Sequence, residues 1–245
     1  MEAVRKRIGD NMDYIMTNHE LCGRLLHIAE DLKTLYVMGG IGFPLNASGK
    51  KRAMQYVYNQ SETRKRMIMN ASDDTFAFDC VCLVKSILWG FSGDKNKRYG
   101  GALYASNGIP DCSITYLYNM GSKQSTDMSD IAEGEFLMLH AHHCGVYVGN
   151  GLVVESTPAW ENKVQITKLA QRPWKAHCYL PKVKYEGVYP SNYQYYPYPQ
   201  YTDVELAYRV IKGLHKAGEE RKKDLGARYR TVQDIVNKIA KEGRP

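Results

Sequence analysis

The residues best suited to chemistry in this chain begin with a cysteine that opens an apolar helical stretch. A cysteine attacks as its thiolate, which forms readily at a helix N-terminus beside a histidine that accepts the proton. Cys80 opens such a stretch, and Asp79 before it is suited to cap the helix. The backbone N–H groups of the first turn would face the sulfur and a developing oxyanion. The sequence therefore makes Cys80 the candidate nucleophile.

A histidine and a carboxylate that suit this cysteine flank a predicted hairpin. His143 opens the strand HCGVYV, where alternation places it on one face with Gly145 and Tyr147. Glu155 ends the returning strand, close enough to accept a hydrogen bond from the imidazole across the ladder. A third polar group of this kind orients the histidine in catalytic triads. We therefore expect Cys80, His143 and Glu155 to act as nucleophile, proton shuttle and orienting residue.

The remaining thiols and histidines favour structural roles. The six cysteines show neither a CxxC pair nor the spacing of a zinc site, so we expect free thiols. The run HAHHC at 140–144 lacks the carboxylate or second cysteine that a four-ligand zinc site needs. We predict no metal and no cofactor. Core or loop positions are expected for Cys22, Cys82, Cys144, Cys178, His140, His142 and His177.

The elements that must position these residues read as helices first and an antiparallel sheet second. Apolar periodicity predicts one helix over residues 2 to about 33 and a buried one over 80–89, which Gly90 ends. The stretch GVYVGNGLVVES predicts a hairpin, with further short strands at 164–167 and 177–180. This order indicates an α+β fold.

Composition divides the rest of the chain. Residues 1–184 hold the candidate site, and within them the basic segment 44–74 is expected to be a solvated insertion or surface helix. Residues 185–202 are rich in Tyr and Pro, which predicts a semi-rigid linker. Two amphipathic patterns predict a second, very small domain over 203–245, which carries four of the seven excess positive charges.

Bulk properties narrow the class of protein. With 44% hydrophobic and 24% charged residues the chain is an ordinary globular protein, and no stretch is long and apolar enough to insert into a membrane. The N-terminus lacks the apolar run of a secretory signal, so we expect synthesis in a cytoplasm. A net charge of +7 favours anionic partners, although no aromatic and basic pattern typical of nucleic-acid binding occurs. We expect a monomer.

Three motifs resemble the NlpC-type papain-like cell-wall peptidases. FDCVCLV at 78–84 is similar to their DCSGLV signature, and HCGVYVGNG at 143–151 to their HVGIYVGNG. The family's third catalytic position follows the histidine by twelve residues, which is Glu155 here. YVMGG at 36–40 resembles their YxWGG, whose tyrosine hydroxyl lies beside the cysteine. The resemblance implies a papain-like NlpC-type fold over about 30–180, with Cys80, His143, Glu155 and Tyr36 as catalytic residues.

The chain also departs from this pattern. Val81 and Cys82 replace the usual Ser and Gly, and Glu155 is more typical of the related CHAP amidase branch. Cys112, in PDCSITYL, is the main competitor for the role of nucleophile. It lacks the apolar residues of the signature and an upstream YxxGG element at a sensible distance, which favours Cys80.

The C-terminal segment resembles the cell-wall-binding repeat first known from a pneumococcal phage lysozyme. The shared elements are V-I-x-G, E-x-R-K-K and L-G-x-R-Y-x-x-V-Q-x-x-V-N. The resemblance implies a small three-helix module that binds the muropeptide. Its matching positions make candidate ligand-binding residues of Arg221, Arg228, Tyr229, Gln233 and Asn237.

Together these resemblances imply a phage endolysin that hydrolyses peptidoglycan. We expect it to be made in the host bacterial cytoplasm without a signal peptide and to act on the wall after release. The predicted reaction cuts an amide bond of the stem peptide, next to D-glutamate. The alternatives are an N-acetylmuramoyl-L-alanine amidase, a papain-like acyltransferase, deamidase or interbacterial toxin, and a non-catalytic wall-binding protein.

Overall fold

The computed structural model describes residues 13–185 and 203–242. The chain divides into two compact units, Met1–Glu186 and Gly187–Pro245. The predicted linker over 185–202 lies outside the described residues except for Tyr185. The hydroxyl of Tyr185 accepts a hydrogen bond from the Leu180 N–H at 2.9 Å and donates one to the Gly134 carbonyl at 2.7 Å. Tyr185 therefore belongs to the first unit.

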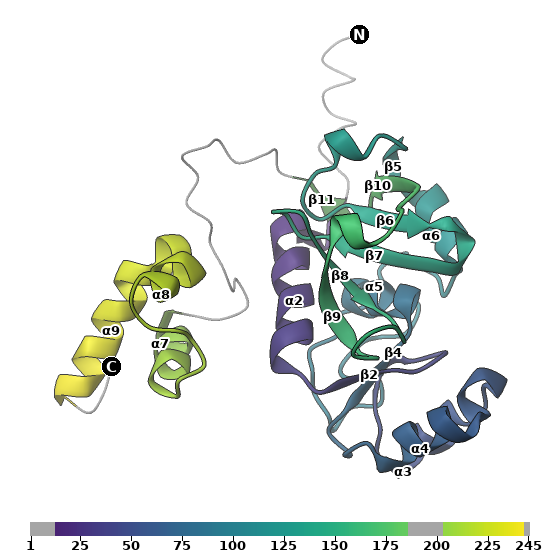
Figure 1. The fold of residues 1–245 in the computed structure, drawn as a ribbon, viewed down its shortest axis with the longest axis horizontal. Coiled ribbons are helices and arrows are strands. Elements are labelled where there is room, and N and C mark those ends of the chain that lie inside the picture. Colours follow the sequence, from purple (N-terminus) through teal and green to yellow (C-terminus); the bar gives the residue numbers. More distant parts are fainter. Residues whose placement is uncertain (1–12, 186–202, 243–245) are drawn as a thin grey trace, which may run out of the picture. The chain divides into compact units, whose positions relative to one another are not determined.

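The first unit is built around an antiparallel sheet (Figure 1). In its described part this sheet has six strands, in the order β5 (Ser122–Ser125), β10 (Ala176–Tyr179), β6 (Phe136–Leu139), β7 (His143–Tyr147), β8 (Leu152–Ser156) and β9 (Val164–Lys168). A second sheet has three strands in the order β2 (Thr34–Tyr36), β4 (Phe76–Phe78) and β3 (Ile41–Pro44). A third consists of the parallel strands β1 (Met16–Thr17) and β11 (Val183–Lys184). The α+β class and the predicted strands at 164–167 and 177–180 are confirmed.

Two helices cover the inner face of the large sheet. Helix α5 (Cys80–Leu88) packs on β7 and β8, and α2 (Asn18–Asp31) packs on β9. Between and around them lie α3 (Ala47–Ala53), η1 (Val57–Gln60), α4 (Glu62–Asn70), α6 (Ile114–Met120), η2 (Met128–Asp130), η3 (His140–His142) and η4 (Leu169–Gln171). Figure 1 shows α3 and α4 at the end of the unit beside the small sheet, away from β5 and β10. The core lies between α2, α5 and the inner sheet face.

The first helix is shorter than the sequence predicted. Its predicted start at residue 2 lies outside the described residues, but α2 begins only at Asn18. Thr17 has an extended backbone and accepts a hydrogen bond from the Glu20 N–H, while the Glu20 carboxylate accepts one from the Thr17 N–H at 2.8 Å. This capping box starts the helix where the prediction had it continuing. Leu21, Leu25 and Ile28 are buried, as the periodicity indicated.

The predicted helix after Asp79 is confirmed. The Asp79 carboxylate accepts a hydrogen bond from the Cys82 N–H at 2.7 Å, which satisfies a backbone donor that the first turn leaves free. The apolar side chains of α5 are buried except for that of Val81, which is partly buried, so the helix is held by the core rather than by its propensity. It ends at Leu88, and Gly90 follows with a φ of +87° that favours glycine. The helix therefore presents its N-terminus at a fixed place.

The predicted hairpin is also confirmed. Strands β7 and β8 pair with Val146 opposite Val154, and the turn carries positive φ at Gly149, Asn150 and Gly151. Alternation turns Cys144, Val146 and Val154 into the core against α5, whereas Tyr147 packs in a separate cluster on the outer face. The hairpin thus fixes which side chains of β7 face the helix.

The segment 44–74 forms the predicted surface helices, and it is pinned to the unit by a buried amide. Asn59 donates to the carbonyls of Met38 and Ala53 at 2.9 and 2.8 Å and accepts from the Met38 N–H at 3.1 Å. Lys51, Lys65 and Arg66 are exposed. The inserted helices are therefore attached directly to the YVMGG segment.

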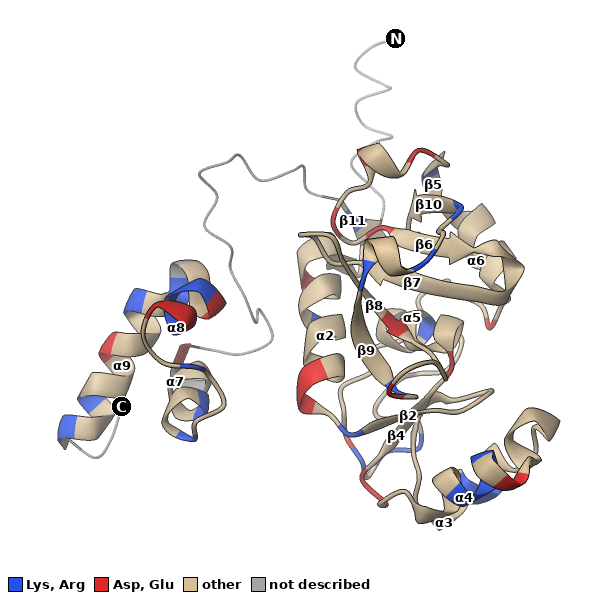
Figure 2. Ribbon diagram, in the orientation of Figure 1, with Lys and Arg blue, Asp and Glu red and all other residues tan. Residues whose placement is uncertain are grey.

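The second unit is a small helical module. Helices α7 (Asp203–Ile211), α8 (Gly218–Leu225) and α9 (Tyr229–Glu242), with η5 (Gly226–Arg228) before α9, surround a core of Leu206, Ala207, Val210, Leu225 and Val232. This agrees with the three-helix module that the resemblance implied. Lys and Arg residues alternate with Asp and Glu residues along α8 and α9 (Figure 2). A core this small makes the isolated module marginal in stability.

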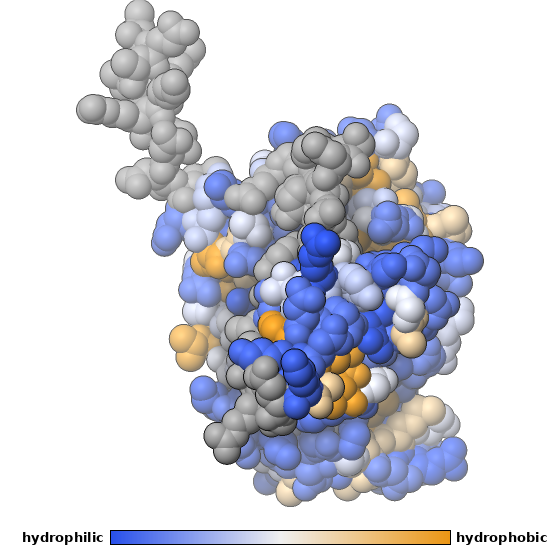
Figure 3. Space-filling view, turned by 90° about the vertical axis from the view of Figure 1, so that its left-hand side faces the viewer, coloured by the Kyte–Doolittle hydropathy of each residue, from blue (hydrophilic) through white to orange (hydrophobic). Residues whose placement is uncertain are grey.

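In the described part of the chain, every helix is too short or too polar to span a bilayer. The face of the protein drawn in Figure 3 is mostly hydrophilic, with hydrophobic residues in small separate groups.

Candidate active site

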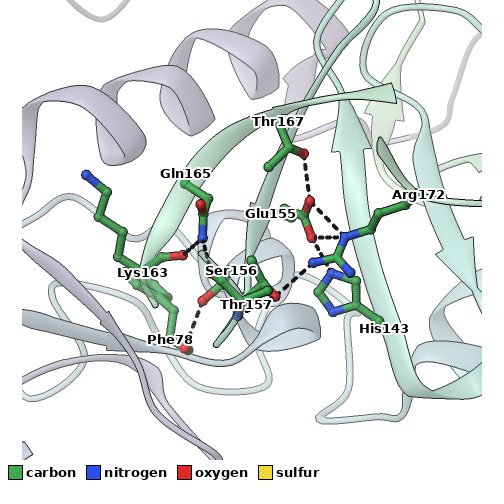
Figure 4. Close-up of polar contacts among 10 residues, drawn as sticks. Phe78, His143, Glu155, Ser156, Thr157, Lys163, Gln165, Thr167 and Arg172 are labelled. Atoms are coloured by element: carbon green, nitrogen blue, oxygen red, sulfur yellow. Dashed lines mark hydrogen bonds and ion pairs between the residues drawn. The ribbon is translucent and has the colours of Figure 1, made fainter. Parts of the chain in front are cut away.

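The structure brings Cys80, His143 and Glu155 together at the N-terminus of α5. Strand β7 packs on this helix, and its first residue, His143, lies close enough to the Cys80 sulfur to lower the pKa of that thiol. The His143 Nε2 donates to the Glu155 Oε2 at 2.5 Å (Figure 4). Since Nε2 donates to the carboxylate, we infer that Nδ1 is the ring nitrogen that exchanges a proton with the cysteine. A thiol, an imidazole and a carboxylate thus form one connected chain.

The surroundings of Cys80 stabilise its thiolate. The largest effect is a hydrogen bond with the Cys144 side chain, which lowers the pKa; burial raises it, and the hydrogen bond and charge of His143 lower it again, to about 5. Burial lowers the pKa of His143, but the hydrogen bonds with Cys80 and Glu155 raise it overall. At neutral pH Cys80 is therefore a thiolate, which is the reactive form of a cysteine nucleophile, and the raised pKa of His143 favours an imidazolium beside it.

Glu155 is a fully buried carboxylate with a complete set of donors. Its Oε1 accepts from the Thr167 hydroxyl at 2.6 Å and from the Arg172 Nε at 3.0 Å, and its Oε2 lies 2.7 Å from the same nitrogen (Figure 4). Burial raises the pKa of Glu155, but the hydrogen bonds from His143, Arg172 and Thr167 lower it overall. The carboxylate stays ionised and holds the His143 ring in place.

Sequence reasoning missed these supporting residues. Arg172 and Thr167 lie 17 and 12 positions from Glu155, and neither carries a local motif. The Trp174 ring stacks on the His143 imidazole with centroids 5.9 Å apart. One available signal was chemical, because a buried carboxylate requires a cation and donors close by. That rule gives the residue type but not its position.

Tyr36 lies near enough to Cys80 for their charges to interact. Its ring is buried, and burial, followed by the charges of Cys80 and Asp79, raises the pKa of its hydroxyl. The Asp79 carboxylate joins this segment to the helix, because its second oxygen accepts from the Gly39 N–H at 3.1 Å. Gly40 approaches the backbone of β4 so closely that a Cβ there would lie 2.7 Å from the Ala77 carbonyl carbon. The two glycines allow the tyrosine segment to pack against the nucleophile's helix.

Cys112, the main competitor, lies elsewhere in the first unit. Burial raises its pKa, and its carbonyl accepts a hydrogen bond from the Lys85 Nζ at 2.8 Å. Lys85 is a buried cation of α5 that also pairs with Asp111. The PDCS sequence therefore serves to neutralise and anchor α5 and offers no activated thiol.

Most of the other cysteines and histidines have structural surroundings. Cys22, Cys82 and Cys178 are buried thiols whose pKa burial raises. His140 and His142 are exposed on η3, and His177 is a sheet histidine that pairs with Glu135. Residues 13–185 and 203–242 contain no group of three or more ligands suited to a metal ion. Cys144 is the exception among the expected core residues, because it is buried and also contacts Cys80.

The candidate ligand residues of the second unit fall into two groups. Arg228 is buried and pairs with Asp203 at 2.6 Å, and Tyr229 packs against the small core, so both support the fold. Arg221 donates to the Gln233 side chain at 3.0 Å, and Gln233 donates to Asn237 at 3.0 Å. These last three form a polar row that joins α8 to α9.

A cysteine at a helix N-terminus that meets a histidine on an antiparallel sheet is an arrangement suited to thiol-based nucleophilic chemistry. The sequence matches the NlpC/P60 family over residues 45–183, more than half of the chain, and the protein belongs to that family. Residues 204–240 match the CW_7 repeat. Domains of the NlpC/P60 family are typically cysteine peptidases that act on peptidoglycan. The chain thus joins an NlpC/P60 domain to a CW_7 repeat.

Two solved structures of NlpC proteins from Trichomonas vaginalis are similar to this chain. NlpC2 is 15% identical, with a TM-score of 0.34, over 69% of this chain and 48% of that one. NlpC1 is 14% identical, with a TM-score of 0.33, over 67% of this chain and 44% of that one. The chain therefore spans about half the length of these relatives. No curated protein matches it.

Proposed function

We propose that the protein is a peptidoglycan hydrolase that cuts an amide bond of the stem peptide, next to D-glutamate. The observation that carries this proposal is the connected chain of Cys80, His143 and Glu155, with the pKa of Cys80 lowered to about 5. A thiolate that exists at neutral pH beside a cationic proton donor is suited to cleave an unactivated amide. Membership of the NlpC/P60 family supports peptidoglycan as the substrate.

The reaction follows from the positions of these groups. The Cys80 thiolate forms a bond to the amide carbon, and the carbonyl electron pair moves to the oxygen. Backbone N–H groups at the start of α5, together with the Tyr36 hydroxyl, stabilise that oxyanion. The His143 imidazolium gives its proton to the leaving nitrogen as the C–N bond breaks, which leaves a thioester. Neutral His143 then takes a proton from water, whose oxygen attacks the thioester and releases the Cys80 thiolate.

Glu155 orients His143 throughout this cycle and exchanges no proton with the substrate. Its carboxylate keeps the Nε2 of His143 protonated, so that Nδ1 carries the mobile proton. The Arg172 ion pair and the Thr167 hydroxyl keep that carboxylate ionised in a buried place. The orientation of His143 therefore does not depend on solvent.

We further propose that the second unit holds the enzyme on the wall and that the protein acts as a phage endolysin, made in the bacterial cytoplasm and active after release. The CW_7 match and the net positive charge of residues 203–245 support binding to a polyanionic wall. The polar row of Arg221, Gln233 and Asn237 supports a contact with the muropeptide. We expect the protein to act as a monomer.

A second candidate is an N-acetylmuramoyl-L-alanine amidase, which would use the same nucleophile on a different amide. The observation that favours it is Glu155 as the orienting residue, a choice more typical of the CHAP amidase branch. The chemistry of the two candidates is identical up to the thioester. They differ only in which carbonyl reaches Cys80.

Digestion of purified peptidoglycan tests both candidates. Wild type, Cys80→Ala and the matched control Cys112→Ala are incubated with the same wall preparation, and the new termini are identified by mass spectrometry. We expect wild type and Cys112→Ala to release the same peptides with a new terminus next to D-glutamate. New muramic acid and L-alanine termini would establish the amidase instead. Equal release by Cys80→Ala would exclude Cys80 as the nucleophile.

A further inference from the structure

Two arginines hold the same loop beside the site. The loop over residues 157–163 joins β8 to β9. On one side, the Arg172 Nη2 donates to the Thr157 hydroxyl at 2.9 Å, and its guanidinium lies 4.6 Å from the Trp160 ring centroid. On the other side, Arg64 of the inserted helix α4 donates to the Asn162 side chain at 2.5 Å and to the Tyr36 carbonyl. The loop is thus fixed at both ends by a guanidinium.

The two arginines differ in charge balance. Arg172 is neutralised by Glu155, whose carboxylate lies 2.7 Å away. Arg64 contacts neutral groups, because its guanidinium lies over the rings of Tyr36 and Tyr58 at 5.3 and 5.2 Å and bonds to an amide and a carbonyl. Among the residues that the structure describes, none forms an ion pair with Arg64.

The surroundings of Arg64 also destabilise its positive charge. The side chain is partly buried, and its Nε is buried with no hydrogen-bond acceptor in the described structure. Burial lowers the pKa of this guanidinium, because it removes water from the charged form. A desolvated cation without a counter-ion is unfavourable, whereas one that meets an incoming anion gains a charge-assisted hydrogen bond. The position is therefore suited to a negatively charged ligand.

The place of Arg64 connects it with the reaction. Its guanidinium rests on the ring of Tyr36, and the hydroxyl of that same ring lies within electrostatic reach of the Cys80 thiolate. One N–H on each terminal nitrogen of Arg64 remains after its bonds to Asn162 and Tyr36. A ligand held by these donors lies one aromatic ring away from the nucleophile.

We propose that Arg64 is a substrate-binding residue that recognises a carboxylate of the stem peptide beside the amide that Cys80 attacks. This inference rests on the proposed function. A glutamyl residue that is linked through its side chain keeps a free α-carboxylate, which matches a guanidinium in charge and planar shape. The insertion over 44–74 thereby contributes to specificity through α4.

The test compares two synthetic stem peptides that differ only at this group. One has the free α-carboxylate on the glutamyl residue, and the other has the α-carboxamide. The variants are Arg64→Gln and the matched control Lys65→Gln, an exposed cation next to it on α4. A hydrogen bond to a charged group contributes about 1.5–3 kcal/mol, so we expect wild type to prefer the acid by about 10-fold to 100-fold in kcat/KM. Arg64→Gln should lower this ratio to about one, whereas Lys65→Gln should keep the preference.

Two results would overturn the inference: a wild type with equal kcat/KM for both peptides, or an Arg64→Gln protein that loses the same factor on both. The second result would assign Arg64 to holding the loop. Binding of both peptides to Cys80→Ala and to Cys80→Ala with Arg64→Gln, measured by calorimetry, reads the same preference without turnover. Cleavage by Cys80→Ala would refute the proposed function, whereas equal cleavage of both peptides by the wild type would refute only the role of Arg64.

Discussion

Arg172 supplies a permanent positive charge to the buried carboxylate of Glu155, and replacing Arg172 by Met tests this ion pair directly. In the folded protein the Glu155 side chain is 0% exposed and that of Arg172 is 16% exposed, so solvent cannot replace the guanidinium. Methionine keeps most of the apolar stem of arginine and removes its charge. Arg172→Met therefore leaves a buried carboxylate with only His143 and Thr167 as donors.

The expected cost comes from this burial. Removing one partner of a buried ion pair typically costs about 3–5 kcal/mol, because it leaves an uncompensated charge. Since two donors remain and Arg172 keeps some exposure, we expect the lower end, about 3 kcal/mol of unfolding free energy at pH 7. The folded pKa of Glu155 is depressed, so its contribution is present above the unfolded pKa and disappears as the pH falls through the folded one. The cost of Arg172→Met must therefore shrink below about pH 4.5, the ordinary value for Glu.

Urea unfolding followed by circular dichroism measures the loss of unfolding free energy in Arg172→Met at pH 7 and again below about pH 4.5. The control is a double-mutant cycle with Glu155→Gln, in which the two substitutions together should cost less than the sum of the single ones. A cost below about 0.5 kcal/mol at pH 7, typical of a surface substitution, would refute the reasoning. So would a cost that is unchanged in acid, since it would show that the charge of Glu155 is not involved.

Three further predictions concern the neighbours of Cys80 and the second unit. Cys144→Ala removes the largest contribution that lowers the pKa of Cys80, so the pH midpoint of Cys80 alkylation should move upward, whereas Cys144→Ser keeps a donor and should move it less. An unchanged midpoint in Cys144→Ala would contradict this contact. Tyr36→Phe keeps the buried ring and removes the hydroxyl, so kcat on peptidoglycan fragments should fall about 100-fold with little change in melting temperature, and an unaltered kcat would exclude Tyr36 from the oxyanion site. Deletion of the chain after residue 201 should reduce sedimentation with cell walls without changing the bond that is cut; equal sedimentation would show that the second unit does not bind.

The local signals in the sequence predicted the parts of the site that depend on short stretches of chain. The apolar spacing after Asp79 and the glycines at 149 and 151 predicted the helix and the hairpin, because caps and turns are decided by a few neighbouring residues. The predicted start of α2 was wrong, although the sequence contains the signal for the observed start at Asn18. Thr17 and Glu20 have the T-x-x-E spacing of a capping box, which outweighed the helical pattern before it.

The contacts that decide the electrostatics were not predictable in the same way. Arg64 and Asn162 are 98 positions apart, and Cys144 was expected only as a core residue. Such pairs arise from how the insertion and the sheet pack in three dimensions, and no period or motif in the sequence encodes them. Composition indicates that a buried carboxylate needs a cation, but only the fold selects Arg172 for Glu155.

The state of Cys80 is the most direct test of the proposed mechanism. Wild-type protein is treated briefly with iodoacetamide over a pH series, and alkylation of each cysteine is read by peptide mass spectrometry, with Cys112 as the internal comparison. We predict half-maximal reactivity of Cys80 near pH 5, and Cys112 reacting only at alkaline pH, because burial raises its pKa. His143→Ala should shift the Cys80 midpoint upward. A Cys80 midpoint near the ordinary thiol value of 9.0 would contradict the thiolate and imidazolium pair on which the proposed function depends.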